Sequence, residues 1–336
     1  MAPNPNQGEF AIGDSSFLIT GGTGSFGSTM VRKLLLEGAR QVRVFSRDES
    51  KHFGLANEIQ DSRVEYQIGD IRDSASLEYA LRDIDYVFHA AALKHVPASE
   101  SNPFEYVKTN IEGSHNLLSK LSRSNAKSAV FLSTDKSVYP VNAMGMSKAL
   151  MEKLVRSSRY LGGAVPSITR YGNVVGSRGS IIPLLISHIK NDKPIQITDW
   201  TMTRFMMSLE ESVSLVLFAM EKGEHGDLFV KKSPAADLRT ILEAVELLLG
   251  TKAKKIQVVG PRPGEKIHET LLSSEERTFA QETSLFFRVP SVVLNSEDRT
   301  PPMGLRSEYR SDNTDMLSTD ELVGILSKNE DILKLL

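Results

Sequence analysis

The chain has 336 residues, of which 40% are hydrophobic and 24% are charged, as in a folded globular protein rather than a disordered one. Its 40 Lys and Arg residues nearly balance its 42 Asp and Glu residues, which argues against a nucleic-acid-binding protein held by a basic surface. The sequence contains no cysteine, which excludes disulfides and thiolate metal sites. Residues 1–14 lack the pattern of a signal peptide, and no apolar run approaches the roughly 18 residues of a membrane helix. We therefore expect a cytoplasmic protein without a membrane partner.

The first half of the chain alternates short β-rich runs with helical patterns. Residues 17–20, 42–45, 64–68, 86–88 and 129–132 are the expected strands. Between the last two runs, Val107, Ile111, Leu118 and Leu121 recur at helical spacing and are expected to share one face. Strands that alternate with helices predict an α/β, Rossmann-type doubly wound parallel sheet, covered on both faces, over residues 1–172.

The regular alternation ends near Gly172. Helices are expected over residues 181–190 and 209–221, and strands over 195–197, 228–230 and 256–259. We interpret residues 173–290 as a smaller α/β substrate lobe, with chain crossings back to the first domain allowed. Residues 291–336 include a polar, Pro-containing stretch and a last helix near 320–326. They are expected to form an arm laid over another part, such as a second subunit, or else a loose terminus.

A glycine-rich segment follows the first expected strand and opens a helix. Gly21, Gly24 and Gly27 stand three residues apart, a spacing that permits a tight turn, close approach of the backbone to a pyrophosphate and close helix–strand packing. The helix N-terminus adds N–H groups and a positive dipole end. This strand–turn–helix context predicts a dinucleotide site. The loop residues expected to contact the dinucleotide also include Thr23, Ser25 and Phe26.

The end of the second strand bears on the choice of cofactor. NAD enzymes commonly place an acid there, to bind the ribose 2′-hydroxyl. Here Ser46 and Arg47 occupy the position, with Lys51 one helical turn on, and a guanidinium suits a 2′-phosphate. Asp48 is a counter-argument, although it is equally interpreted as a helix N-cap. We favour NADP over NAD. Further expected cofactor contacts are Asp70 and Ile71 near the adenine, and Ala90, Ala91, Ala92, Lys94, Asn110, Lys148 and Tyr171.

The fifth expected strand ends in Thr134, Asp135 and Lys136. An acid beside a base, at the carboxyl end of a strand in a cofactor cleft, suits proton transfer; the alternative is a surface ion pair in a loop. Lys148 follows on a helix, from which it can reach the nicotinamide ribose. We expect no metal site.

A set of segments spread over most of the chain carries a family resemblance: ITGGTGSFG at 19–27, FSRDE at 45–49, GDIRD at 69–73, HAAALKHVP at 89–97, VKTN at 107–110, STDKSVYPVNAMGMSKALMEK at 133–153, TRYGNVVGSRGS at 169–180, MTRFMMSLEE at 202–211 and RPGEKIHE at 262–269. With these segments the sequence resembles an extended short-chain dehydrogenase/reductase. More closely, it resembles the soluble C5-inverting UDP-N-acetylglucosamine 4,6-dehydratases of bacterial capsule, O-antigen and flagellin-sugar pathways.

One position departs from the superfamily pattern Tyr-x-x-x-Lys. Met144 stands where the tyrosine is expected, four residues before Lys148, and a thioether cannot deprotonate an alcohol. A capsule-associated branch of these dehydratases resembles this sequence in having Met there. The base that acts at C4 is therefore left open among Lys148, Asp135, Tyr139 and an ordered water.

The resemblance implies a concealed redox cycle on a UDP-sugar. NADP would oxidise C4, Lys136 would remove the C5 proton, Asp135 would protonate the departing C6 hydroxyl, and hydride would return to C6 to give an L-configured 4-keto-6-deoxy sugar. For this role the pKa of Lys136 is expected to be lowered. The resemblance also implies a homo-oligomer built on dimers, such as a hexamer. The expected substrate contacts are Lys94, His95, Asn173, Arg178, Thr198, Arg204, Arg262 and Glu265.

Two other functions stay open on the sequence alone. A nucleotide-sugar 4-epimerase would share the fold and the step at C4, but it would be expected to have tyrosine at position 144 and would not need Asp135 and Lys136. A non-catalytic NADP-binding regulator is favoured by Met144 and opposed by Asp135, Lys136 and Lys148 together.

Overall fold

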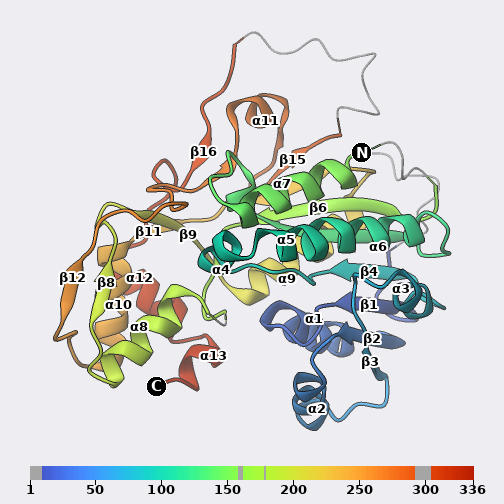
Figure 1. Cartoon of the computed structure of the whole chain (residues 1–336), viewed down its shortest axis with the longest axis horizontal. Coiled ribbons are helices and arrows are strands. Elements are labelled where there is room, and N and C mark those ends of the chain that lie inside the picture. Colours follow the sequence, from blue (N-terminus) through green and yellow to red (C-terminus); the bar gives the residue numbers. More distant parts are fainter. Residues whose placement is uncertain (1–9, 158–161, 178, 292–303) are drawn as a thin grey trace.

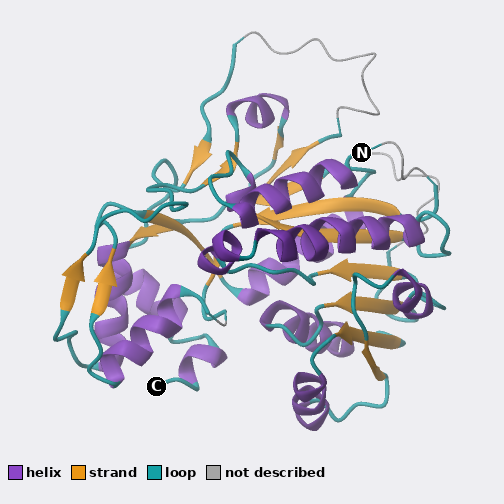
Figure 2. Cartoon of the chain, in the orientation of Figure 1, coloured by secondary structure: helices purple, strands orange, loops and turns teal. Residues whose placement is uncertain are grey.

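A nine-stranded sheet runs through the centre of the molecule in the computed structural model, which describes residues 10–157, 162–177, 179–291 and 304–336 (Figures 1 and 2). Its strands follow the spatial order β14 (Gln281–Glu282), β15 (Phe286–Val289), β10 (Leu228–Lys231), β6 (Val165–Tyr171), β5 (Ser128–Thr134), β4 (Tyr86–His89), β1 (Ser16–Thr20), β2 (Gln41–Ser46) and β3 (Val64–Ile68). All the pairings from β3 to β10 are parallel, and β15 runs antiparallel to both of its neighbours. The α/β, doubly wound prediction and its five strands are confirmed.

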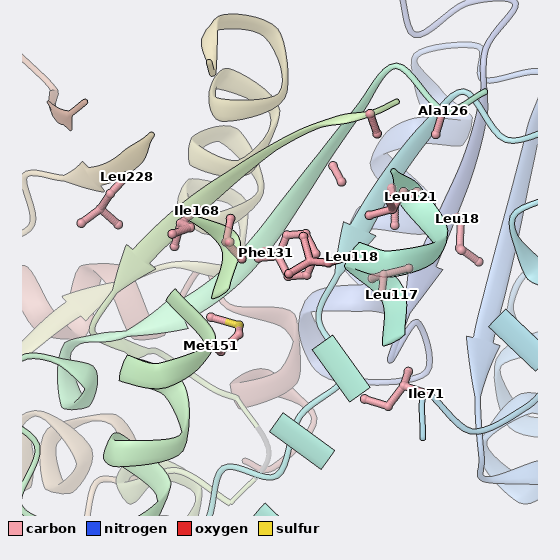
Figure 3. Packing of buried hydrophobic residues seen from close by; sticks show 14 of the residues in the cluster. Leu18, Ile71, Leu117, Leu118, Leu121, Ala126, Phe131, Met151, Ile168 and Leu228 are labelled. Atoms are coloured by element: carbon pink, nitrogen blue, oxygen red, sulfur yellow. The ribbon is translucent and has the colours of Figure 1, made fainter. Parts of the chain in front are cut away.

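Helices cover both faces of this sheet because successive strand residues point to opposite sides. On one face, Leu18 and Phe131 pack with the helices α3 (Ser74–Ala80), α6 (Gly113–Leu121) and α7 (Ala143–Val155). Figure 3 shows Phe131 of this cluster beside Leu118 of α6. On the other face, Phe17 and Val130 pack with α1 (Ser25–Leu36), α2 (Glu49–Glu58) and α9 (Leu209–Lys222). The carboxyl ends of β1, β4 and β5 thus meet at one rigid edge.

The connection from β4 to α6 contains a π-helical turn. It runs through α4 (Val96–Ser101), α5 (Pro103–Tyr106) and the π-helix η1 (Val107–Glu112). The expected common face of Val107 and Ile111 with Leu118 and Leu121 is wrong, because only the two leucines are buried. A π turn rotates the residues that precede it relative to those that follow, and such turns are frequent at functional sites.

The smaller lobe packs its helices against two short sheets. Its core contains Ile182, Ile186, Ile241 and Leu322. Its helices are α8 (Ile181–Lys190), α10 (Leu238–Leu249), α12 (Thr319–Leu326) and α13 (Glu330–Leu333). One sheet pairs β8 (Ile195–Ile197) with β12 (Ile256–Val258), and the other has the order β11 (Ala235–Asp237), β9 (Thr203–Met207), β7 (Asn173–Val174).

Two features describe how the second half of the chain is organised. The strand predicted at 228–230 belongs to the main sheet, because Leu228 pairs with Ile168 of β6 and is fully buried there. The expected arm, from Gly304 onward, lies on its own chain: β16 (Tyr309–Arg310) pairs with β13 (Thr270–Leu272), next to α11 (Ser274–Phe279), and α12 packs against α10. Residues 292–303 of that arm lie outside the described residues. Within the described parts of the chain, no helix has the length and apolar character needed to cross a membrane.

Candidate functional site

The glycine loop forms a cradle at the carboxyl end of β1. Gly21 has a φ of +70°, and a Cβ placed there would lie 2.8–2.9 Å from backbone atoms of Ala90 and Ala91. A Cβ on Gly27 would lie 2.5 Å from the Gly22 Cα. Gly24 is the N-cap of α1 and provides no side-chain cap. Backbone N–H groups at an uncapped helix N-terminus, beside a side-chain-free turn, suit a pyrophosphate. The cradle therefore fits a dinucleotide.

Polar groups gather where β2 ends. Thr23 Oγ1 lies 3.0 Å from Ser46 Oγ, which in turn lies 2.8 Å from His52 Nε2. Asp48 is the N-cap of α2, as one interpretation of the sequence predicts: its Oδ1 accepts from the Lys51 N–H at 3.0 Å. Arg47 is half exposed, and its Nη1 lies 3.5 Å from Asp70 Oδ2. This end of β2 thus presents a cation and hydroxyl groups, with the Asp48 carboxylate engaged by its own helix.

Two of the expected cofactor residues serve the scaffold. Asn110 lies on the π turn and bonds both backbone groups of Leu93, accepting from its N–H at 2.8 Å and donating to its carbonyl at 2.9 Å. Asn110 also donates to Ser147 Oγ at 2.9 Å, which ties the segment after β4 to α7.

Ile71 is buried, with Gly113 packed against it. Tyr171, at the end of β6, pairs in register with Thr134, and burial raises the pKa of its phenol.

A single 3₁₀ turn, η2 (Asp135–Ser137), carries the expected acid and base directly after β5. Thr134 is its N-cap and also donates its hydroxyl to Asp135 Oδ1 at 2.9 Å. The turn packs tightly against the start of α7, because a Cβ on Gly145 would lie 2.2 Å from the Lys136 carbonyl oxygen. Glycine at position 145 therefore lets helix and turn approach each other, and the main chain that carries Asp135 and Lys136 is fixed.

Lys136 lies between two buried carboxylates. Its Nζ is 3.0 Å from Asp135 Oδ1 and 3.2 Å from Glu269 Oε1. Burial alone would lower the pKa of Lys136, but the two carboxylates outweigh burial and raise it. The lowered pKa expected from the sequence is thus wrong for this structure, because the sequence pattern does not show that Glu269 joins Asp135. Burial raises the pKa of Asp135, against the effect of Lys136, which suits a carboxyl group that gives up a proton.

A pocket of about 210 Å³ opens beside this pair, between the main sheet and the smaller lobe. It brings together five of the residues selected from the sequence: Lys136, Asn173, Thr198, Arg204 and Glu265. Sequence reasoning missed the other lining residues, Val96, Asn142, Ile181, Met202, Leu238, Gly264, Lys266 and Glu269. The RPGEKIHE segment at 262–269 could have indicated this part of the lining, because it contributes four pocket residues: Gly264, Glu265, Lys266 and Glu269.

Other candidates lie apart from this pocket lining. Lys94 and His95 are exposed, although the His95 ring borders Gly179. Arg262 lies on the rim of the smaller lobe, where its Nη2 donates to Gln196 Oε1 at 2.7 Å. Arg178 lies outside the described residues. Tyr139 has a φ of +46° and is 53% exposed, and burial together with Glu308 raises the pKa of its phenol.

Lys148 and Met144 occupy buried positions on α7. Lys148 Nζ donates to the Leu132 carbonyl at 2.8 Å, and burial lowers its pKa to about 8. Met144 is 3% exposed, so its thioether is packed rather than solvated. Burial therefore makes the neutral amine of Lys148 easier to form than that of an ordinary lysine.

A buried ion network supports the turn at 135–137. The Glu152 Oε1 atom accepts from Ser133 Oγ at 2.5 Å and from Ser137 Oγ at 2.7 Å, so one carboxylate oxygen joins the end of β5 to the last residue of the turn. Arg170 pairs with Glu152 at 2.5 Å and with Glu276 at 2.8 Å. The same guanidinium thus links the turn to α11, close in sequence to Glu269.

Comparison with known proteins identifies the family. A family model described as "Polysaccharide biosynthesis protein" matches residues 17–291. The chain belongs to this polysaccharide biosynthesis protein family. A relative from Rickettsia felis, named UDP-glucose 4-epimerase, is 42% identical over 326 residues, which cover 93% of this chain and 95% of the relative. Relatives with the same name from Rickettsia akari and Rickettsia bellii are also 42% identical.

Solved structures of this fold include Pen from Bacillus thuringiensis, 36% identical, with a TM-score of 0.87 over 97% of this chain and 100% of that one. A UDP-N-acetylglucosamine 4-epimerase from Methanobrevibacter ruminantium is 26% identical, with a TM-score of 0.67 over 75% of this chain and 87% of its own. The dTDP-glucose 4,6-dehydratase DesIV from Streptomyces venezuelae, at 24% identity and a TM-score of 0.69, shares the fold. The described residues of this family member contain no group of three His, Asp or Glu side chains placed to hold a metal ion.

Proposed function

We propose that this member of the polysaccharide biosynthesis protein family is an NADP-dependent UDP-N-acetylglucosamine 4,6-dehydratase that inverts C5. The observation that carries the proposal is the pairing of Asp135 with Lys136 at 3.0 Å directly after β5, where Lys136 lines a pocket between the main sheet and the smaller lobe. Dehydration of a sugar needs both a base for C5 and an acid for the C6 hydroxyl, in addition to redox chemistry at C4.

The bound dinucleotide would accept hydride from C4 and return it to C6. Lys136 removes the C5 proton, whose acidity is raised by the adjacent C4 ketone. Asp135 gives its proton to the departing C6 hydroxyl, and its raised pKa supports this role. Thr134 donates to Asp135 Oδ1 and so orients the carboxyl group. Asn173, Thr198, Arg204 and Glu265 line the pocket in which the UDP-sugar would bind.

Removal of the C4 hydroxyl proton requires a group other than Met144. We assign it to Lys148, whose pKa is lowered to about 8 and whose ammonium lies at the end of β5. Tyr139 is less suited, because burial and Glu308 raise the pKa of its phenol.

A UDP-sugar 4-epimerase is the second candidate, favoured by the names of the Rickettsia relatives. Incubation of the full chain with UDP-N-acetylglucosamine and NADP in deuterated water, followed by NMR, separates the two. A dehydratase yields a C4 ketone, a C6 methyl group and deuterium at C5. Inversion at C4 with C6 and C5 unchanged would replace the dehydratase proposal by the epimerase, and no change in any sugar would contradict both.

Arg47→Ala is expected to weaken NADP binding much more than NAD binding, because only NADP carries a 2′-phosphate. Loss of one charge-assisted contact should reduce the NADP affinity by about 1.5–3 kcal/mol, or roughly 10- to 100-fold. Titration calorimetry with both dinucleotides measures the difference. Arg82→Ala, which removes an exposed arginine in the turn between α3 and β4, is the matched control. Equal weakening of both dinucleotides would contradict the NADP assignment.

Met144→Tyr is expected to leave turnover of UDP-N-acetylglucosamine about the same or lower. Position 144 is buried, so the larger ring should lower stability by about 1–3 kcal/mol, and a buried phenol needs a hydrogen-bond partner. Turnover and thermal unfolding of wild type, Met144→Tyr and Met144→Leu are compared. An inert wild type that becomes active only with tyrosine would favour the non-catalytic regulator instead.

A further inference from the structure

Glu269 is a pocket carboxylate brought to the catalytic turn by tertiary structure. It lies directly before β13, and its backbone N–H donates to Ser311 Oγ at 2.9 Å. Its side chain is 3% exposed and belongs to the pocket lining. The backbone anchor on Ser311, which follows β16, fixes where the carboxylate lies relative to the turn at 135–137.

The two oxygens of this carboxylate have different surroundings. Oε1 lies 3.2 Å from Lys136 Nζ and 3.9 Å from Arg204 Nε, so two cations share it. Oε2 is buried and has no hydrogen-bond partner. A buried carboxylate with an unpaired oxygen is costly unless nearby cations stabilise it, and Lys136 is the nearer of the two.

We propose that Glu269 is a positioning residue for Lys136: its carboxylate fixes the lysine nitrogen at the pocket wall and holds the proton on it. This inference rests on the proposed function, in which Lys136 is the base at C5. Because Lys136 must lose that proton before it can act, the ion pair with Glu269 sets the pH at which the base becomes available.

The charged groups around Lys136 support this role. They come from its own turn (Asp135), from β9 (Arg204) and from the segment before β13 (Lys266 and Glu269). Burial works to lower the pKa of Lys136, whereas Asp135 and Glu269 raise it. The negative charge of Glu269 also contributes to the raised pKa of Asp135. Removal of that charge should therefore lower both pKa values.

Glu269→Gln keeps the shape of the side chain and removes its charge. Both limbs of the pH profile for C5 deuterium exchange are expected to move to lower pH by about 1–3 units, the usual effect of one close charge. Because an amide holds the ammonium less firmly, the maximal rate should fall roughly 10- to 100-fold. Glu269→Asp keeps the negative charge, but its shorter side chain places the carboxylate farther from Lys136. It should therefore lower the maximal rate and shift the pH profile less than Glu269→Gln does.

The test combines two measurements on the full chain. The first is the pH profile of C5 exchange with UDP-N-acetylglucosamine. The second uses no substrate: the pKa of Lys136 is measured by NMR of ¹³C-labelled lysine, with its signal assigned by its loss in Lys136→Met. Glu275→Gln, which removes an exposed carboxylate on α11, is the control and should match wild type in both.

The outcomes separate this inference from the proposed function. A lower Lys136 pKa in Glu269→Gln supports the inference, even if no form of the protein turns over the sugar, in which case the proposed function alone fails. An unchanged Lys136 pKa in folded Glu269→Gln overturns the inference, whatever the turnover. If Glu269→Gln does not fold, the pKa of Lys136 is measured in Glu269→Asp instead: a lower value than in wild type supports the inference, and an unchanged value overturns it.

Discussion

Lys136→Met is expected to abolish deuterium incorporation at C5 and to lower dehydration of UDP-N-acetylglucosamine about 10²- to 10⁴-fold, the usual effect of losing a positioned acid–base group. Lys136 is the amine held 3.0 Å from Asp135 on the pocket wall, and methionine keeps a similar length without a proton-accepting atom. Because the dinucleotide cradle and Lys148 are unchanged, reduced dinucleotide should still form when substrate is added.

Two measurements follow the steps separately: the absorbance of the reduced dinucleotide reports hydride transfer from C4, and NMR reports proton exchange at C5. Lys153→Met is the matched control, since Lys153 is an exposed lysine of α7 that does not line the pocket. It should retain C5 exchange. Normal exchange in folded Lys136→Met would remove Lys136 from the mechanism.

Arg170→Met is expected to lower the free energy of unfolding at neutral pH by about 3–5 kcal/mol, because it leaves one buried and one partly buried carboxylate without their cation. Arg170 is 3% exposed and pairs with Glu152 at 2.5 Å and with Glu276 at 2.8 Å. Arg40→Met, which breaks an exposed arginine–Asp85 pair at 3.1 Å, is the control and should change stability by less than about 1 kcal/mol.

The same network predicts how stability depends on pH. Burial alone would raise the pKa of Glu276, but Arg170 outweighs burial and lowers it from 4.5 to about 2. A carboxyl group with a lowered pKa in the folded state stabilises the protein above its unfolded pKa. This contribution, about 3 kcal/mol, is lost as the pH falls from about 4.5 to 2. Chemical denaturation at several pH values measures it; in Arg170→Met the acid-dependent loss in this window should shrink, and an unchanged loss would contradict the assignment.

The sequence predicts those parts of the structure that depend on local pattern. Strand–helix alternation identifies the first five strands, and the turn at Gly21 and the N-cap at Asp48 follow from the chemistry of single residues. Thr134, Asp135 and Lys136 are expected at a strand end because the apolar run at 129–132 comes shortly before them. Each of these signals lies within about one turn or strand of the residue that it predicts.

What the sequence does not reveal depends on contacts between distant segments. The strand at 228–230 joins the main sheet only through its register with β6, so its local pattern could not distinguish the two sheets. Glu269 reaches Lys136 only when the segment before β13 packs against the turn after β5. For the same reason the expected direction of the Lys136 pKa shift is wrong: of the two carboxylates that raise this pKa, only Asp135 is a neighbour in the sequence, whereas Glu269 is distant.

The path of the chain between the two lobes has a consequence for folding. The smaller lobe receives β7 and α8 before the chain returns to the main sheet at β10, and it receives α12 only after the main sheet has gained β15. Each lobe is therefore completed by segments that follow parts of the other, so neither is a continuous stretch that can be excised. During synthesis the smaller lobe must wait for α12, whose Leu322 is fully buried in its core, and until then its apolar helix faces lack their last partner. The two lobes should consequently unfold together rather than as separate domains.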